Sequence, residues 1–222
     1  MPSSAATAPT HVVWDWNGTL FDDFGLTARI AERTLARLGV PGVTGEGIRR
    51  EFRRPFGDFY ASLFGRPVSA DEFAYIRERY ELEYAQELET VSLQPDAGEA
   101  MDLIAAKASQ SLLSMAPDAQ LQTLVDRHDI RSRFVLVEGS PRTDSDGVKA
   151  LRLAQHLEAI EVDPATAVVI GDTVDDHEAA VHCGARAVLV TTGSTSRANL
   201  EATRAIVVDT LREAAVVVVE PM

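Results

Sequence analysis

The chain contains little of what secreted or membrane-spanning proteins require. Its single cysteine, Cys183, cannot form an internal disulfide bond, which favours a reducing compartment. The longest apolar runs, such as residues 214–219, are far too short to cross a bilayer. Residues 1–10 have neither a basic start nor an apolar centre, so they predict a loose tail and not a signal peptide. We therefore expect a cytoplasmic protein without a membrane partner.

Basic residues are also scarce. With 21 Lys and Arg against 34 Asp and Glu, the formal net charge is −13, so the chain lacks the basic field that binding to nucleic acid requires. A small phosphorylated ligand remains compatible with this charge, because a Mg²⁺ ion and a few Lys or Arg side chains can reverse the sign inside one cleft. At 222 residues, 45% hydrophobic and 25% charged, the composition is that of one large globular domain or a core with a small insert.

Hydrophobic patterning indicates the second of these architectures. Short apolar or β-branched runs alternate with helix-length segments, which is typical of a parallel, doubly wound α/β sheet. Amphipathic segments without a convincing strand predict an all-helical insert. We predict an α/β core of residues 1–22 and 95–222 and a small helical domain of residues 23–94. The expected strands are 12–14, 111–114, 134–138, 167–170, 187–190 and 205–208, and the expected helices are 26–38, 46–54, 55–63, 70–88, 98–107, 121–127, 148–157, 175–183 and a last one after residue 209.

The first expected strand ends in a carboxylate. Asp15 follows the apolar run at 12–14, and Gly18 permits a sharp turn, so that main-chain groups can approach whatever Asp15 holds. In an open α/β sheet, ligands bind at the carboxyl ends of the strands. Asp15 is therefore the first candidate for chemistry.

The segment Asp15-Trp16-Asn17-Gly18-Thr19-Leu20 resembles the first motif of the haloacid dehalogenase superfamily, Asp-x-Asp-Gly-Thr-Leu. The resemblance implies that Asp15 attacks a phosphoryl group and that the main-chain carbonyl of residue 17 binds Mg²⁺. The second acid of the motif, which shuttles protons, is replaced by Asn17, whose amide cannot exchange a proton. Hydrolysis is then expected to be slow, confined to good leaving groups, or assisted by another acid such as Asp22 or Asp23.

Phosphate contacts are also implied by the resemblance. Ser114 ends an apolar run and matches the Ser or Thr that binds the transferred phosphoryl group, whereas Met115 stands where an Asn is often found. We predict phosphate contacts at Ser114, Met115, Gly18 and Thr19. A Ser that merely begins a turn is the alternative.

Lys149 and a cluster of acids complete the predicted site. The Lys149 cation can offset a nucleophilic carboxylate and a phosphate, although most lysines are solvated. Asp172, Asp175 and Asp176 directly follow an expected strand, and acids this close repel one another unless a cation relieves them. The stretch resembles the superfamily motif Gly-Asp-x-x-x-Asp, which implies a Mg²⁺ site formed by Asp15, Asn17, Asp172 and Asp176. Asp175 is expected to serve the start of the helix, and a solvated, acidic helix start is the alternative for the whole stretch.

Substrate choice is expected to come from the insert. Arg53 and Arg54 lie in an arginine- and phenylalanine-rich stretch of an otherwise acidic protein. Guanidinium groups suit a carboxylate or a second phosphate on a small substrate. Beside Glu51, these arginines are equally compatible with a solvated helix face.

The resemblance leads to one main function and two alternatives. It implies a Rossmann-like core with a helical cap, and a Mg²⁺-dependent phosphatase of the phosphoglycolate phosphatase type. This enzyme would hydrolyse a small phosphorylated metabolite through an aspartyl phosphate on Asp15, as a monomer or homodimer. The second hypothesis is a phosphoryl-binding or regulatory protein whose turnover is lost through Asn17. The third, dehalogenation by the same Asp15, needs no metal and leaves the acids at 172–176 unexplained.

Overall fold

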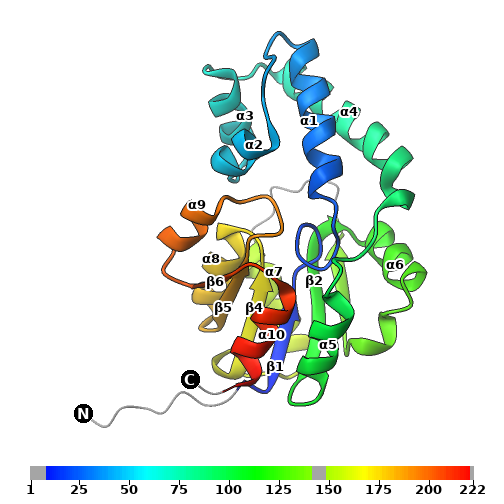
Figure 1. Cartoon of the computed structure of the whole chain (residues 1–222), viewed down its shortest axis with the longest axis vertical. Helices are drawn as coiled ribbons and strands as arrows, with labels where there is room; N and C mark the ends of the chain where they lie inside the picture. Colours follow the sequence, from blue (N-terminus) through cyan, green and yellow to red (C-terminus); the bar gives the residue numbers. More distant parts are fainter. Residues whose placement is uncertain (1–8, 142–148, 221–222) are drawn as a thin grey trace.

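Six parallel strands form one sheet in a computed structural model that describes residues 9–141 and 149–220. Residues 1–8 of the expected tail and residue 148 of the expected helix lie outside the described residues. The strand order is β3-β2-β1-β4-β5-β6, so β1 lies at the centre (Figure 1). This confirms the predicted doubly wound sheet. The strands are β1 His11–Trp14, β2 Ser109–Pro117, β3 Val137–Ser140, β4 Ala167–Gly171, β5 Arg186–Val190 and β6 Ile206–Val208.

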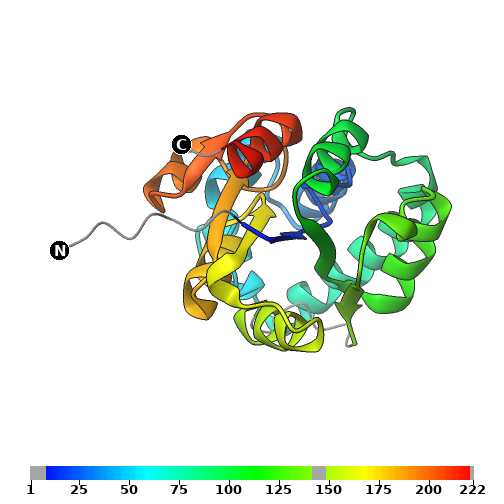
Figure 2. The ribbon, with the colours of Figure 1, turned by 90° about the horizontal axis from the view of Figure 1, so that it is seen from below.

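The two faces of the sheet are buried by different helices. Successive side chains of a strand point to opposite faces, and accordingly Val12 and Trp14 belong to one hydrophobic cluster while Val13 belongs to another. Helices α5, α6 and α10 cover the first face, and α7 and α8 cover the second. Figure 2 shows α10 and α5 on one side of the sheet and α7 on the other. These helices, with α9, are α5 Ala97–Ala105, α6 Asp118–Arg127, α7 Lys149–Ala159, α8 Val174–Cys183, α9 Arg197–Ala202 and α10 Leu211–Val219.

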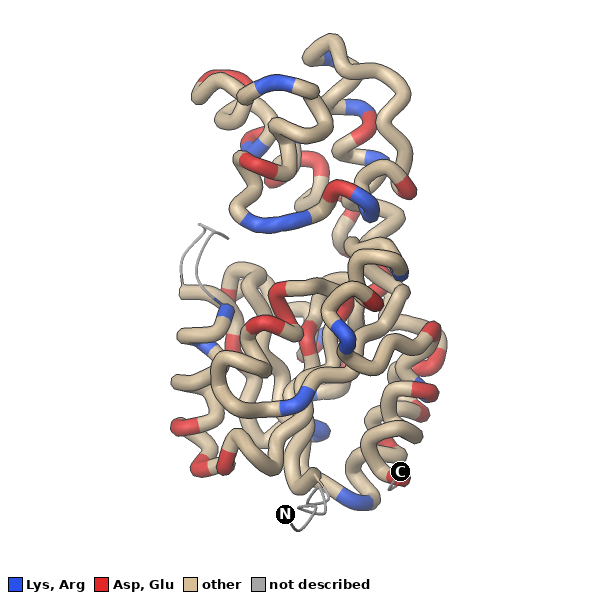
Figure 3. Tube along the Cα trace, turned by 90° about the vertical axis from the view of Figure 1, so that its left-hand side faces the viewer, with Lys and Arg blue, Asp and Glu red and all other residues tan. Residues whose placement is uncertain are grey.

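Four helices between β1 and β2 form a separate unit above the carboxyl ends of the strands (Figure 1). Two connecting segments join this unit to the sheet side by side, because Asp22 N donates to Ser92 O at 3.0 Å and Gln94 N donates to Leu20 O at 2.9 Å. Figure 3 shows basic positions interspersed with acidic ones on both units. The helices are α1 Phe24–Arg37, α2 Gly45–Glu51, α3 Phe56–Phe64 and α4 Ala70–Glu87.

Four of the predicted elements were wrong by three residues at one end. The strand expected at 111–114 ends at Pro117, and the helix expected at 121–127 begins at Asp118. The strand expected at 134–138 is Val137–Ser140 instead, because the side chain of Val135 is 61% exposed and is not part of a buried run. The helix expected at 46–54 ends at Glu51, because Phe52 leaves the helical conformation with φ −57° and ψ +126°. Pro55 in turn disfavours helical backbone at Arg54. In the described part of the chain, no helix is both long enough and apolar enough to span a membrane.

Candidate active site

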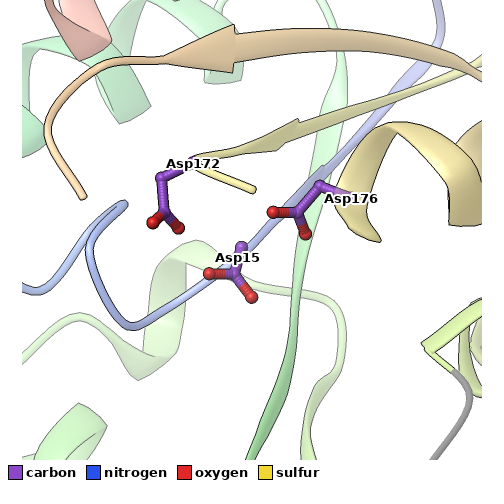
Figure 4. A group of neighbouring side chains, drawn as sticks. All are labelled: Asp15, Asp172 and Asp176. Carbon is purple, nitrogen blue, oxygen red and sulfur yellow. The ribbon is translucent and has the colours of Figure 1, made fainter. Parts of the chain in front are cut away.

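Three buried carboxylates meet at the carboxyl ends of two neighbouring strands. Asp15 directly follows β1, Asp172 directly follows β4, and Asp176 lies in the first turn of α8. Their exposed fractions are 7%, 1% and 0%, and one oxygen of each lies within 4.8 Å of the others. Figure 4 shows the three side chains pointing toward one another. The predicted convergence of Asp15 with the acids of the 172–176 stretch therefore exists in the fold.

Main-chain and hydroxyl donors hold the carboxylate of Asp172 in place. Its Oδ1 accepts a hydrogen bond from Thr19 Oγ1 at 3.1 Å, and its Oδ2 accepts one from Ser194 N at 2.6 Å. Gly18 has a φ of +72°, and a Cβ there would lie 2.7 Å from Asp172 Oδ2. A Cβ on Gly193 would overlap with the same carboxylate. The loops after β1 and β5 are thus shaped by glycine to admit this acid, and Thr19 contacts the acid rather than lying free for a phosphate.

Asp176 is held by the start of its own helix. Its Oδ2 accepts hydrogen bonds from Thr173 N at 2.9 Å and from Thr173 Oγ1 at 2.6 Å, which completes a capping box. Asp176 is therefore oriented toward Asp15 by local helix-start chemistry.

Lys149, the first residue of α7, contacts both Asp15 and Asp176 through its ammonium group. Burial opposes the charge of this lysine, but the two carboxylates outweigh it and raise its pKa. Burial raises the pKa of Asp15 to about 6 against the opposing effect of Lys149, and it raises the pKa of Asp172 well above its usual range. One cation thus faces three carboxylates, which leaves an excess of two negative charges when all are ionised. Such a donor set fits a divalent, oxygen-seeking cation.

The side chain of Asn17 belongs to a group of three polar side chains that are hydrogen-bonded to one another. Its Nδ2 donates to Asp23 Oδ2 at 2.8 Å and to the hydroxyl of Tyr84 at 3.0 Å, and that hydroxyl donates to Asp23 Oδ2 at 2.8 Å. Asp23 is 1% exposed, and burial raises its pKa. Of the two alternative acids named from the sequence, Asp23 lines the cavity described next, whereas Asp22 is exposed and bonds to Gln94 at 3.3 Å.

A cavity of about 410 Å³ lies between the sheet and the helical unit. Asp15, Lys149 and Asp172 line it from below, and Ser114 and Met115 line it at the end of β2. The hydroxyl oxygen of Ser114 accepts a hydrogen bond from Ala116 N at 3.0 Å, so its proton remains available to donate. The structure therefore brings Ser114 and Met115 together with the acids.

Arg53 and Arg54 separate in the structure. Arg54 lines the cavity, and its Nε lies 2.9 Å from Asp175 Oδ2. Asp175 thus contacts the insert as well as standing in the first turn of α8. Arg53 does not line the cavity; its side chain is 51% exposed and lies 3.4 Å from Glu51. Arg53 therefore lies on a solvated face, as the alternative interpretation of the sequence stated, whereas Arg54 lines the cavity.

Sequence reasoning missed two kinds of site residue. Gly193 and Ser194 follow β5, and their position at the carboxyl end of a strand is the signal that could have identified them. Tyr84 lies on α4, 67 positions from Asn17, and no local signal marks it. Arg49 of α2 is another such residue, since its Nε donates to Gly193 O at 2.8 Å and holds the insert against the sheet unit.

Comparisons with known proteins agree with this geometry. A family model described as haloacid dehalogenase-like hydrolase matches residues 12–181, and a second, hydrolase-like model of the same group matches residues 149–214. No curated protein gives a significant match.

Many solved structures have the same fold. One from Streptococcus pneumoniae, a haloacid dehalogenase-like hydrolase, has a TM-score of 0.77 at 22% identity and covers 94% of this chain and 97% of its own. A haloacid dehalogenase-like protein of unknown function from Agrobacterium tumefaciens has a TM-score of 0.78 at 18% identity, covering 95% and 98%. A predicted phosphoglycolate phosphatase from Haemophilus somnus has a TM-score of 0.70 at 16% identity, covering 92% and 96%.

Proposed function

The chain belongs to the family of haloacid dehalogenase-like hydrolases, and from that premise we propose that it is a Mg²⁺-dependent phosphatase acting on a small phosphorylated metabolite. One observation carries the proposal: Asp15, Lys149 and Asp172 line one end of a cavity, and Asp176 contacts Lys149 beside them. The phosphatase names of several similar structures add support.

Asp15 is the proposed nucleophile. A carboxylate oxygen of Asp15 forms a bond to phosphorus as the bond from phosphorus to the ester oxygen breaks, and the alcohol leaves. Lys149 and the hydroxyl of Ser114 hold the phosphoryl oxygens, one as a cation and one as a neutral donor. Water then cleaves the aspartyl phosphate and releases inorganic phosphate.

The donor set around Asp15 fits Mg²⁺. We assign the ion to Asp15 and Asp172 with the main-chain carbonyl of Asn17, and Asp176 is the supporting acid that also holds Lys149. When bound, Mg²⁺ supplies charge neutralisation of the phosphoryl oxygens. The excess of negative charge among these buried side chains supports this assignment.

Proton transfer needs a group other than Asn17. Asp23 lines the same cavity and accepts a hydrogen bond from the amide that occupies the place of the missing acid. We assign to Asp23 the protonation of the leaving oxygen and the activation of water. General acid–base help of this kind is worth roughly 10²–10⁴-fold.

The two alternatives differ in what they require. A phosphoryl-binding protein without turnover requires that Asp23 has no catalytic role and that Asn17 abolishes proton transfer. Dehalogenation by Asp15 gives no role to the buried carboxylates of Asp172 and Asp176, and it is therefore disfavoured.

We further propose that residues 1–22 and 95–222 carry the catalytic groups and that residues 23–94 form a cap that closes over them. The two adjacent connecting segments near Asp22 and Gln94 support this division, and the ion pair of Arg54 with Asp175 supports the closure of the cap. A cytoplasmic setting is proposed from the lone cysteine, and the protein is expected to act as a monomer or homodimer.

The decisive experiment measures phosphate release from a panel of phosphate monoesters. With Mg²⁺, the wild-type protein should release phosphate, and both a chelator and Asp15→Asn should abolish release. Asp71→Asn, an identical change at an exposed position of α4, is the matched control and should retain full activity. Phosphate release that persists in Asp15→Asn would refute the assignment of Asp15 as the nucleophile, and with it the proposed phosphatase function.

A further inference from the structure

The cavity has two chemically different ends. The sheet end holds the carboxylates and Lys149, whereas the end formed by the helical unit is built largely from rings. The sequence contains only 14 aromatic residues, 8 Phe, 4 Tyr and 2 Trp, so their gathering at one end of one cavity is not a consequence of abundance. Eight of them line the cavity, all from the helical unit, and Phe24 and Tyr84 are two of these. The other six are Phe52, Phe56, Phe59, Tyr60, Phe73 and Tyr80.

These rings hold one another in fixed orientations. The Phe52 and Phe59 ring centroids lie 5.6 Å apart at 61°, and those of Tyr60 and Phe73 lie 6.0 Å apart at 74°. Edge-to-face contacts of this kind are favourable and fix the orientation of each ring relative to its partner. Phe59 is buried at 4% exposure, but Phe52, Tyr60 and Phe73 are half-buried. The helical unit thus presents a preorganised aromatic wall, defined here as the six residues named above.

Charge at this end of the cavity is balanced. Among the described lining residues of the helical unit, Arg54 is paired with Asp175 at 2.9 Å, and Arg77 lies 3.9 Å from Glu81. Each cation therefore already faces an acid. A substrate that carries a carboxylate next to its phosphate, as phosphoglycolate does, would meet a neutral, apolar wall and lose hydration without gaining a new cationic partner.

The volume of the cavity also disfavours a substrate as small as phosphoglycolate. A cavity of about 410 Å³ falls within the ~300–1,000 Å³ typical of pockets for drug-sized ligands. A two-carbon acid would leave most of the aromatic wall without contact.

On the basis of the proposed phosphatase function, we propose that the physiological substrate is a phosphate monoester whose alcohol carries a planar aromatic or heteroaromatic ring, which stacks on the aromatic wall while the phosphate reaches Asp15. Tyr60 and Tyr80 both line the cavity, and neither hydroxyl makes a hydrogen bond within the described residues. Polar substituents or a ring nitrogen of the substrate are the groups that they would bind.

The test compares esters whose leaving groups are all primary alcohols, so that differences in intrinsic reactivity are small. Benzyl phosphate carries the ring, cyclohexylmethyl phosphate carries a ring of similar size without an aromatic face, ethyl phosphate has neither, and phosphoglycolate carries the carboxylate. We expect kcat/KM for benzyl phosphate to exceed that of each of the others by about fivefold to tenfold, the size of one aromatic contact. Equal or higher kcat/KM for phosphoglycolate would overturn the inference.

Variants locate the preference in the wall. Tyr60→Leu and Phe73→Leu keep an apolar side chain but remove the aromatic face, so they should reduce the ratio of kcat/KM for benzyl over cyclohexylmethyl phosphate by several-fold. Phe64→Leu, at the end of the same helix as Tyr60 but outside the cavity lining, should leave the ratio unchanged. A ratio that survives both wall variants would overturn the inference.

A binding measurement keeps the inference testable if no ester is hydrolysed, which would count against the proposed function alone. Calorimetric titration with benzylphosphonate and ethylphosphonate in the presence of Mg²⁺ requires no turnover. Tighter binding of benzylphosphonate that is lost in Tyr60→Leu supports the aromatic site, whereas equal dissociation constants overturn it.

Discussion

Exchanging the side chains at positions 17 and 23 tests where the catalytic proton resides. In the wild-type protein, the amide of Asn17 donates to the carboxylate of Asp23 across 2.8 Å. The double variant Asn17→Asp with Asp23→Asn reverses donor and acceptor but preserves the bond between them. Asp23→Asn alone leaves two amides facing each other and removes the carboxylate from the cavity.

The expected magnitudes follow from these contacts. If Asp23 supplies the proton, Asp23→Asn should reduce kcat by roughly 10²–10⁴-fold, equivalent to about 3–5 kcal/mol of activation free energy. The same variant should lower the free energy of unfolding by about 1–3 kcal/mol, because its amide nitrogen leaves at least one of the buried donors around position 23 without an acceptor. The double variant should recover kcat to within about tenfold of the wild-type value, since an acid again faces the cavity.

Steady-state phosphate release gives kcat, and urea denaturation gives the free energy of unfolding, so the catalytic and structural effects separate. A protein in which Asp23 is only structural behaves differently. Its Asp23→Asn variant would lose stability with little change in kcat, and the double variant would exceed the wild-type kcat by orders of magnitude because Asn17→Asp restores a lost acid. That outcome would refute the assignment of Asp23 and favour a phosphoryl-binding role for the natural protein.

Three further predictions address stability, the metal and the buried lysine. Burial and a second histidine nearby lower the pKa of His11 from 6.5 to about 4, so the unfolded chain binds more protons between these values and stability is lost as the pH falls through them. The loss should approach about 3 kcal/mol, and His11→Gln should flatten the pH dependence of urea midpoints between pH 7 and 4; an unchanged slope would contradict this. Gly193→Ala should displace Asp172 and weaken Mg²⁺ binding in calorimetry by about 10–100-fold, whereas Gly57→Ala, where a Cβ meets nothing within 4 Å, should not. Lys149→Met should lower kcat by about 10²–10³-fold and destabilise the metal-free protein in thermal unfolding, with added Mg²⁺ restoring part of the loss; full activity in this variant would remove the lysine from the mechanism.

The fold and the centre of the site could be predicted because they depend on local patterns. Asp15, Ser114 and Asp172 each end an apolar run, and the carboxyl ends of parallel strands lie at one edge of a sheet. The family motifs then supplied the order of the remaining groups. Residues at such positions can be predicted without knowing which side chains pack together in the folded protein.

The contacts between the helical unit and the sheet unit could not be predicted in the same way. Arg53 and Arg54 are neighbours in the sequence, and only the path of the backbone near Pro55 decides which of them lines the cavity. Tyr84 reaches Asp23 from 61 positions away because α4 packs beside α1. Such pairings arise from tertiary packing, which no pattern of spacing encodes.

The departure of Asn17 from the family motif is explained by its partner. If residues 17 and 23 were both carboxylates, two oxygens about 2.8 Å apart would share a site in which Asp23 is 1% exposed, and like charges this close cannot both ionise. Only one of the two positions can therefore hold an ionised acid, and an amide at the other satisfies it as a donor. Because Gly18 N also donates to Asp23 Oδ1 at 2.8 Å and Tyr84 donates to Oδ2 at 2.8 Å, the carboxylate is well satisfied at position 23. In this arrangement the amide of Asn17 supplies a donor to the carboxylate of Asp23 without adding a second acid to the site.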